Sequence, residues 1–169
     1  MQNDDWASEI VTHLELLEKR ANSMDKMHDM ASKYFRRKEV MFGLPPVVLA
    51  AVMAPITLMV SAATHDTCDV VTLSDYVSTM GFTAIAFFSS VAGFFRYGVR
   101  SEKHGAFSAR YSDVASDIGN TLIKRRLLRQ NSEVVLENVK LRLDFLTNLE
   151  PSVPEKIEKQ FLKETRNFD

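Results

Sequence analysis

Residues 40–63 read VMFGLPPVVLAAVMAPITLMVSAA, and residues 76–95 read YVSTMGFTAIAFFSSVAGFF. Neither stretch contains an acidic or basic side chain, and the only acids between them are Asp66, Asp69 and Asp75. A bilayer crossing needs about 20 predominantly apolar residues, whereas an ordinary soluble helix averages about 10–14 residues. The two stretches therefore predict a two-helix transmembrane hairpin, and the lipid bilayer is the first expected partner of the chain.

The bulk composition restricts the classes of partner. The chain has 169 residues and a formal net charge of −1, so it lacks the basic surplus of nonspecific nucleic-acid binders, and no nucleic-acid partner is expected. Its single cysteine, Cys68, permits neither an intramolecular disulfide nor a thiolate metal site. The N-terminus shows no basic segment followed by an early apolar run, so we expect the first span to serve as an uncleaved membrane anchor.

Basic residues lie at the outer ends of the two spans, and the connector at 64–75 carries only acids. The flanking bases are Lys33, Arg36, Arg37 and Lys38 before the first span and Arg96, Arg100 and Lys103 after the second. Short segments rich in Lys and Arg remain on the cytoplasmic side of a membrane. We therefore predict an integral membrane protein with both termini in the cytoplasm and the connector on the opposite side.

Six glycines and five prolines leave little material for loops, and we predict an all-α fold in which long cytoplasmic helices pack as a bundle. Six segments are expected: an N-terminal amphipathic cytoplasmic helix at 1–39, transmembrane helix 1 at 40–63, an acidic non-cytoplasmic connector at 64–75, transmembrane helix 2 at 76–95, a cytoplasmic helical hairpin at 96–150 and a short C-terminal helix at 151–169. The helix of the second span is expected to continue without interruption into the cytoplasm.

Apolar residues recur at steps of three and four before the first span and after the second, as they do along a coiled-coil seam. The predicted cytoplasmic assembly seam consists of Leu14, Leu17, Met24, His28, Phe35, His104, Phe107, Tyr111 and Ile118. Two buried imidazoles, His28 and His104, can form a pH sensor or a ligand site. The alternative is that each is a core histidine hydrogen-bonded to the backbone or to Tyr34 or Tyr111.

Glycine and proline residues predict two features of the first span. Gly43, Pro45 and Pro46 predict a break at its start, with the cytoplasmic helix ending near Phe42. Pro55 lies in the middle of the span and predicts a kink, because it removes a backbone hydrogen bond.

Small residues recur four positions apart in both spans, a spacing that lets transmembrane helices approach closely. The candidates for transmembrane helix contact or pore lining are Ala50, Ala54, Thr57, Ala86, Ser89, Ser90 and Gly93. The same pattern serves packing within one hairpin and contact between copies of the chain, and the sequence leaves both open.

The sequence shows no catalytic constellation. It contains no Gly-rich phosphate loop, no paired-cysteine metal pattern, no His-Glu-x-x-His and no nucleophile elbow. We therefore expect no enzymatic activity, no cofactor and no metal site. The centres of the spans also lack ionisable side chains, which disfavours an active transporter.

In the order of these features the chain resembles the SLATT family, the two-transmembrane effector domains associated with SMODS and SLOG sensor modules. The resemblance covers nearly the whole chain. It rests on the basic aromatic segment Tyr34-Phe35-Arg36-Arg37-Lys38, a first span that opens with proline, a short acidic connector, the pair His104 and Tyr111 next to Ile118, and the tail Leu149-Glu-Pro-Ser-Val-Pro154. It implies a membrane effector of bacterial conflict systems, in which a nucleotide-responsive partner triggers pore formation. SLATT-like chains of large DNA viruses imply a role in the virion or the host membrane.

The expected function is that of an oligomeric two-span membrane protein that forms a pore or disrupts the membrane. A homo-oligomer is expected because two spans cannot enclose an aqueous path by themselves. Since the chain carries no sensor domain, the trigger is expected to come from a separate nucleotide-responsive sensor protein that acts on the cytoplasmic helices. The alternative is a structural membrane protein, such as a virion internal-membrane or envelope component that links the bilayer to a virion protein layer.

Overall fold

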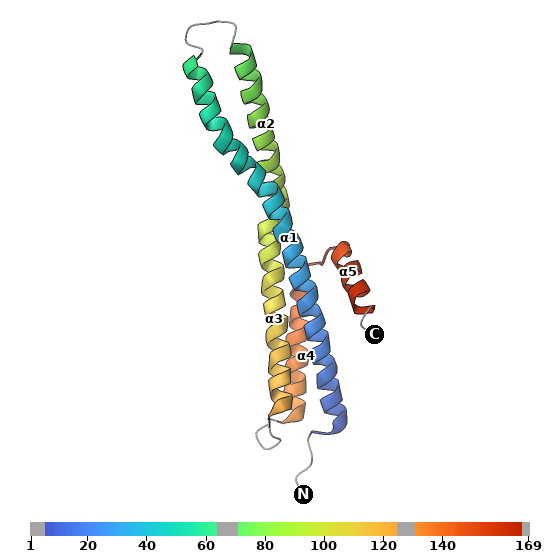
Figure 1. Ribbon diagram of the computed structural model, residues 1–169. Coiled ribbons are helices and arrows are strands. Elements are labelled where there is room, and N and C mark those ends of the chain that lie inside the picture. The colour runs from blue at the N-terminus through green and yellow to red at the C-terminus, as the bar shows by residue number, and fades with distance from the viewer. Residues whose placement is uncertain (1–5, 64–70, 125–130, 167–169) are drawn as a thin grey trace. The chain divides into compact units, whose positions relative to one another are not determined.

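The computed structural model describes residues 6–63, 71–124 and 131–166, and all regular structure in these ranges is α-helical. The helices are α1 (Ser8–Ala63), α2 (Val71–Phe95), α3 (Tyr97–Ile123), α4 (Ser132–Leu149) and α5 (Glu155–Arg166) (Figure 1). The prediction of an all-α fold is confirmed. The chain divides into two compact units, which we describe separately: unit 1 comprises Met1–Lys33 and Ser101–Asp169, and unit 2 comprises Tyr34–Arg100.

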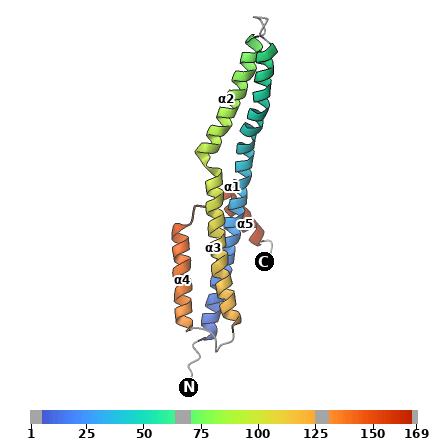
Figure 2. The same ribbon diagram turned by 90° about the vertical axis from the view of Figure 1, so that its left-hand side faces the viewer.

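Unit 1 has an apolar core to which the first half of α1, most of α3 and all of α4 contribute. These helices run side by side in both views (Figure 1 and Figure 2). The buried cluster consists of Trp6, Leu14, Ala21, Phe107, Tyr111, Val114, Ala115, Ile118, Val139, Leu143 and Leu146. Its members on each helix are mostly three or four residues apart, because that spacing places side chains on one face of an α-helix.

Helix α4 has well-defined ends that follow from its flanking residues. Asn131 is the N-cap, and its side-chain oxygen accepts hydrogen bonds from the backbone N–H groups of Glu133 at 2.9 Å and Val134 at 3.4 Å. Glu150 is the C-cap in an extended conformation, with φ −64° and ψ 141°. The extended conformation of Glu150 is the one that the following Pro151 favours.

Unit 2 buries few apolar side chains. Met53 of α1 is 7% exposed and lies against Gly81 of α2, where an added Cβ would come within 2.5 Å of the Met53 Cε. Many large apolar side chains of the unit are instead exposed, and those between 62% and 82% exposed include Val47, Leu58, Met59, Met80, Phe87 and Phe94. The second half of α1 and α2 are therefore apolar on the faces that they turn away from each other.

The predicted break at Gly43, Pro45 and Pro46 is wrong. Helix α1 runs continuously from Ser8 to Ala63 and contains Pro45, Pro46 and Pro55. The fixed φ of proline, about −65°, lies within the helical range, so consecutive prolines remove N–H donors without forcing the chain out of the helix.

The predicted continuity between the second span and the following helix is also wrong. Helix α2 ends at Phe95 and α3 begins at Tyr97, with Arg96 between them in a left-handed conformation, φ 47°. The Arg96 N–H still donates to the Ala92 carbonyl at 3.1 Å, and the Arg96 carbonyl accepts from the Arg100 N–H at 3.1 Å. The interruption is thus confined to one residue, whose conformation is unfavourable by about 1–2 kcal/mol for an L-amino acid.

Other boundaries differ from the prediction by a few residues. Helix α2 begins at Val71, so the exposed Asp75 lies inside the helix and not in the connector. The C-terminal helix α5 occupies Glu155–Arg166. Residues 64–70, which include Asp66, Cys68 and Asp69, lie outside the described residues.

Candidate functional site

The two seam histidines meet in the centre of unit 1. His28 of α1 is 0% exposed and His104 of α3 is 2% exposed, and their Nδ1 atoms are 2.9 Å apart. The second ring nitrogen of His28, Nε2, lies 3.2 Å from the Glu150 Oε2. A chain of hydrogen bonds therefore joins α3, α1 and the C-terminal end of α4.

Aromatic rings enclose His28. The ring of Tyr111 lies nearly parallel to it, with centroids 5.7 Å apart and planes 11° apart, and Phe107 lies at 5.8 Å. Tyr111 also donates its hydroxyl to the Glu150 Oε2 at 2.7 Å, with the Thr147 Oγ1 at 3.5 Å. His28 and Tyr111 thus share one carboxylate oxygen and do not bond to each other directly, so of the alternatives for His28 the direct hydrogen bond to Tyr111 is not formed.

The geometry constrains where protons can sit. An ionised Glu150 can only accept, so His28 donates Nε2–H to it. Between the two Nδ1 atoms, one ring must donate and the other must accept. Burial and, secondarily, the neighbouring His28 lower the pKa of His104 to about 4, against a smaller raising effect of Glu150. Burial likewise raises the pKa of Tyr111 to about 12.

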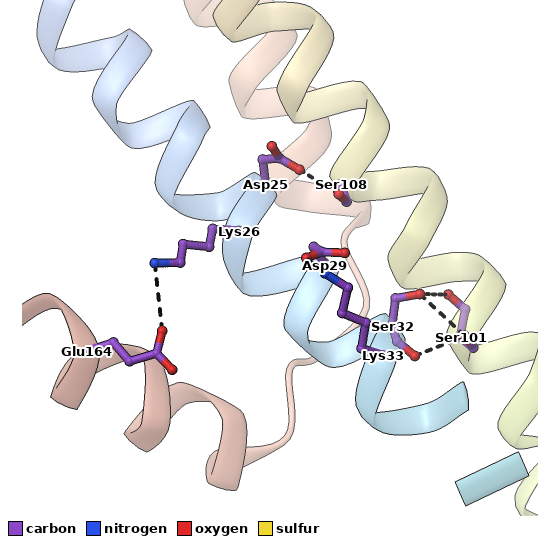
Figure 3. A network of polar contacts seen from close by, with 8 residues as sticks. All are labelled: Asp25, Lys26, Asp29, Ser32, Lys33, Ser101, Ser108 and Glu164. Atoms are coloured by element: carbon purple, nitrogen blue, oxygen red, sulfur yellow. Dashed lines mark hydrogen bonds and ion pairs between the residues drawn. The ribbon is translucent and has the colours of Figure 1, made fainter. Parts of the chain in front are cut away.

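A second group of polar contacts joins α1 to α3 in unit 1 (Figure 3). The hydroxyls of Ser32 and Ser101 each donate to the backbone carbonyl of the other residue at 3.0 Å. About two helical turns away on both helices, Ser108 donates to Asp25 at 2.5 Å. These short bonds hold the two helices in register on both sides of the histidine pair.

Two ion pairs in Figure 3 lie on the surface of unit 1. Lys33 and Asp29 are paired within α1 at 2.6 Å, and Lys26 lies 3.7 Å from Glu164 of α5. All four side chains are at least 40% exposed. Exposed pairs of this kind contribute little to stability.

Most of the predicted seam lies in unit 1. Leu14, His28, His104, Phe107, Tyr111 and Ile118 are buried there, and Leu17 and Met24 pack against the core while remaining partly exposed. Phe35 is buried within unit 2, where its ring stacks on Tyr97 at 6.4 Å and lies under the Arg100 guanidinium at 5.9 Å. The predicted seam is therefore divided between the two units.

The predicted small-residue positions are not brought together within one chain. Ala50, Ala54, Ala86, Ser89, Ser90 and Gly93 are exposed, and apart from the backbone of α2 itself no described atom lies within 4 Å of a Cβ placed on Gly93. Thr57 is half-buried, and its hydroxyl lies 3.0 Å from the carbonyl of Met53 and 2.9 Å from that of Ala54. Pro55 is exposed inside α1, and its kink stays a prediction.

The half-buried residues of α2 lie on the opposite side of that helix. They include Gly81, Ala84, Phe88 and Val91, which recur at three and four residues. Gly81 lies against Met53, so this face is the one turned toward α1. The face of α2 that carries Ala86, Ser89, Ser90 and Gly93 is exposed in the part of the chain that the structure describes.

Sequence reasoning missed three residues. Glu150 is not among the predicted site residues, although a carboxylate directly before a proline at the end of an apolar helix is a signal for a capping or bridging role. Gly81 is also absent from the predicted positions, and its close contact with Met53 has no signal in the sequence. The left-handed Arg96 had none either.

Length and composition make two helical regions, Ser8–Met59 and Asp75–Ile123, candidates for crossing a membrane. Only 11% and 0% of the residues in their most apolar segments are buried. No group of three or more His, Cys, Asp or Glu residues suited to a metal ion occurs in the described parts of the chain. Comparison of the chain with protein-family models, curated proteins and solved structures gives no match.

Proposed function

We propose that this protein is an oligomeric two-span membrane protein of the SLATT type, a pore-forming or membrane-disrupting effector that is triggered through its cytoplasmic helices by a separate sensor. The observation that carries the proposal is the exposed apolar surface of unit 2. Exposed apolar patches of this extent mark sites that contact lipid or another protein.

The membrane hairpin is supported by the low burial of the two apolar segments and by the absence of basic residues from them. A core helix of a soluble protein can be equally long and apolar, but it is then mostly buried, whereas the apolar segments here are 11% and 0% buried. No lysine or arginine occurs between residues 40 and 95. The bases at both outer ends of the hairpin favour cytoplasmic termini.

A collar of aromatic and basic side chains in unit 2 supports the position of the cytoplasmic boundary. Tyr97 stacks on Phe95 at 5.3 Å and on Phe42 at 5.8 Å, and the Lys38 ammonium lies 5.9 Å from the rings of Tyr34 and Phe42. Aromatic and cationic side chains favour the interface between lipid and water.

Self-association is supported by the exposed small-residue face of α2. Close approach of two helices is favoured there, because Ala86, Ser89, Ser90 and Gly93 carry small side chains and are exposed. A second copy is a suitable occupant for this face, and several copies are needed to enclose an aqueous path.

Topology and insertion can be tested with the single cysteine. Alkaline carbonate should fail to extract the protein from membranes, and an impermeant maleimide should label Cys68 from outside intact cells. The matched control is Ser8→Cys combined with Cys68→Ala, in which labelling should require permeabilised cells. Extraction by carbonate, or the opposite labelling pattern, would contradict the proposed hairpin.

Association can be tested by disulfide formation in the Cys68→Ala background. Ser90→Cys, on the small-residue face of α2, should form a cross-linked dimer in the membrane. Ala84→Cys, on the face turned toward α1, is the matched control and should not. Equal cross-linking at both positions would refute a specific contact through this face.

Dye release from vesicles tests the effector activity itself. Purified oligomer should release a small dye from lipid vesicles when the trigger is supplied. An oligomer that releases nothing under any trigger, and that copurifies with particles containing a protein shell, would favour the structural role in a virion.

A further inference from the structure

The contact between His28 and His104 can hold one added proton but not two. The Nδ1 atoms of the two rings are 2.9 Å apart. In a neutral pair or a singly charged pair, one ring presents an N–H and the other a lone pair. When both rings are protonated, each Nδ1 carries a hydrogen and neither can accept, so the contact must break.

We propose that the His28–His104 pair is a proton-binding site that acts as an acid-sensitive latch between α1 and α3. The ligand is the second proton, and the two rings must separate to bind it. Because His28 is 0% exposed and His104 is 2% exposed, that separation requires the core of unit 1 to open.

Groups from three helices surround the pair. Glu150 at the end of α4 accepts from His28 and, at the same oxygen, from Tyr111 of α3. On α1, Asp25 is bonded to Ser108 and Arg20 lies within electrostatic range of Tyr111. Glu150 is the carboxylate that bonds to the pair and favours its protonation, and its bonded oxygen is already shared by two donors.

The direction of the pH effect follows from the closed and open states. In the closed unit the pKa of His104 is about 4, whereas its ordinary value is 6.5. The open unit therefore binds more protons than the closed unit between these values. The stabilisation of the closed unit by the latch is complete above pH 6.5 and is lost as the pH falls toward 4. This loss shifts the equilibrium between closed and open unit 1 toward the open unit by up to about 300-fold.

Opening would expose the apolar faces that α1, α3 and α4 bury against each other. Taken with the proposed function, on which this step alone rests, acidification is then a trigger in its own right. Opening of the latch by acid needs no change in unit 2, because all members of the latch belong to unit 1.

The experiment uses the full chain in lipid nanodiscs. Trp6 is the only tryptophan, is 7% exposed and belongs to the core cluster of unit 1, so its emission reports opening of that core. Between pH 7.5 and 4 the wild type should show a red shift with its midpoint between 4 and 6.5. In His104→Asn, where the amide can replace the Nδ1 hydrogen bond but does not titrate, the midpoint should move down by at least about one pH unit.

Two further variants separate the latch from other titrating groups. The exposed His13 provides the matched control, and His13→Asn should behave as the wild type. Glu150→Gln removes the neighbouring carboxylate and should keep an acid transition. His28→Asn should reproduce the effect of His104→Asn and serves as the second variant should His104→Asn prove unfolded at neutral pH.

Three results would overturn the latch. They are a wild type whose Trp6 emission and urea stability do not change on acidification, a His104→Asn variant with the wild-type midpoint, and the disappearance of the transition in Glu150→Gln. Dye release from closed lipid vesicles, recorded over the same pH range, tests the proposed function separately, since opening of unit 1 without release would contradict the effector activity and leave the latch supported.

Discussion

Replacement of Tyr111 by phenylalanine tests whether the hydrogen bonds around Glu150 stabilise unit 1. The Tyr111 side chain is 1% exposed, and its hydroxyl donates to the Glu150 Oε2 at 2.7 Å. Tyr111→Phe removes that donor and keeps the ring that stacks on His28. The variant therefore isolates one polar contact in an otherwise unchanged core.

The expected loss can be worked from the contact. Because burial raises the pKa of Tyr111 to about 12, the hydroxyl remains a donor throughout the neutral range. Hydrogen bonds to a charged partner contribute about 1.5–3 kcal/mol. Glu150 keeps His28 as a donor at 3.2 Å and is 22% exposed, so water compensates in part. We expect Tyr111→Phe to lower the free energy of unfolding of unit 1 by about 2 kcal/mol, a factor of about 30 in the unfolding equilibrium.

Urea unfolding followed by the emission of Trp6 measures this loss. The same substitution at Tyr76, which is 72% exposed, is the control and should change the free energy by less than about 0.5 kcal/mol. A double-mutant cycle with Glu150→Gln then isolates the pairwise energy. We expect a coupling of about 0.5–3 kcal/mol between the two positions.

Two results would refute this reasoning. A loss below about 0.5 kcal/mol in Tyr111→Phe would show that the hydroxyl is equally well solvated when unit 1 unfolds. Additive effects of Tyr111→Phe and Glu150→Gln would show that the two side chains do not act on each other.

Three further substitutions test the core, the helix junction and the small-residue face. Leu14→Ala removes a fully buried side chain and should cost about 2–5 kcal/mol in the same urea titration, whereas the exposed Leu16→Ala should cost little. Arg96→Gly should raise the free energy of unfolding in detergent by about 1 kcal/mol, because glycine adopts a φ of 47° without strain; Arg100→Gly, within α3, should lower it by about as much, and equal effects would contradict the left-handed conformation. Gly93→Leu places its Cβ in open space on the exposed face of α2 and should weaken self-association by about 1–2 kcal/mol in analytical ultracentrifugation; an unchanged oligomer size would argue against contact between copies.

The helical class and the inward faces of unit 1 could be predicted from the sequence because they depend on local periodicity. Leu14 and Ala21 on α1, and Tyr111 and Ile118 on α3, are one heptad apart, and a spacing of seven returns to the same side of a helix. Burial of one member of such a stripe makes burial of the other probable by geometry alone. Both histidines became core residues for the same reason.

The polar network around the histidines could not be predicted in this way. His28 and Glu150 are 122 residues apart, and their contact depends on how the end of α4 meets α1. Periodicity gives the face of a helix but not its axial position against a neighbour. Arg96 illustrates a second limit, since one dihedral angle ends α2 and no propensity of arginine predicts a positive φ.

Proline illustrates a third limit. The expected break at Pro45 and Pro46 treated the loss of two N–H donors as decisive, but the helix continues through both. A proline is incompatible with a helix through its missing donor and its contact with the preceding turn, not through its φ. In a segment whose neighbours are apolar, leaving the helix would free still more backbone groups than staying in it, so the smaller loss prevails.

The distribution of exposed apolar side chains argues for lipid as the main cover of unit 2. Covering one fully exposed large apolar side chain contributes about 1.5–3 kcal/mol, so covering a dozen that are about half exposed contributes about 10–20 kcal/mol, as much as the whole stability of an ordinary domain. A second copy docked on the small-residue face of α2 covers that face alone. Val47 and Leu58 of α1 and Met80 and Phe87 of α2 lie on other parts of the surface and are each more than half exposed. Apolar exposure on both helices calls for a cover on all sides, which a bilayer provides and a single protein contact does not.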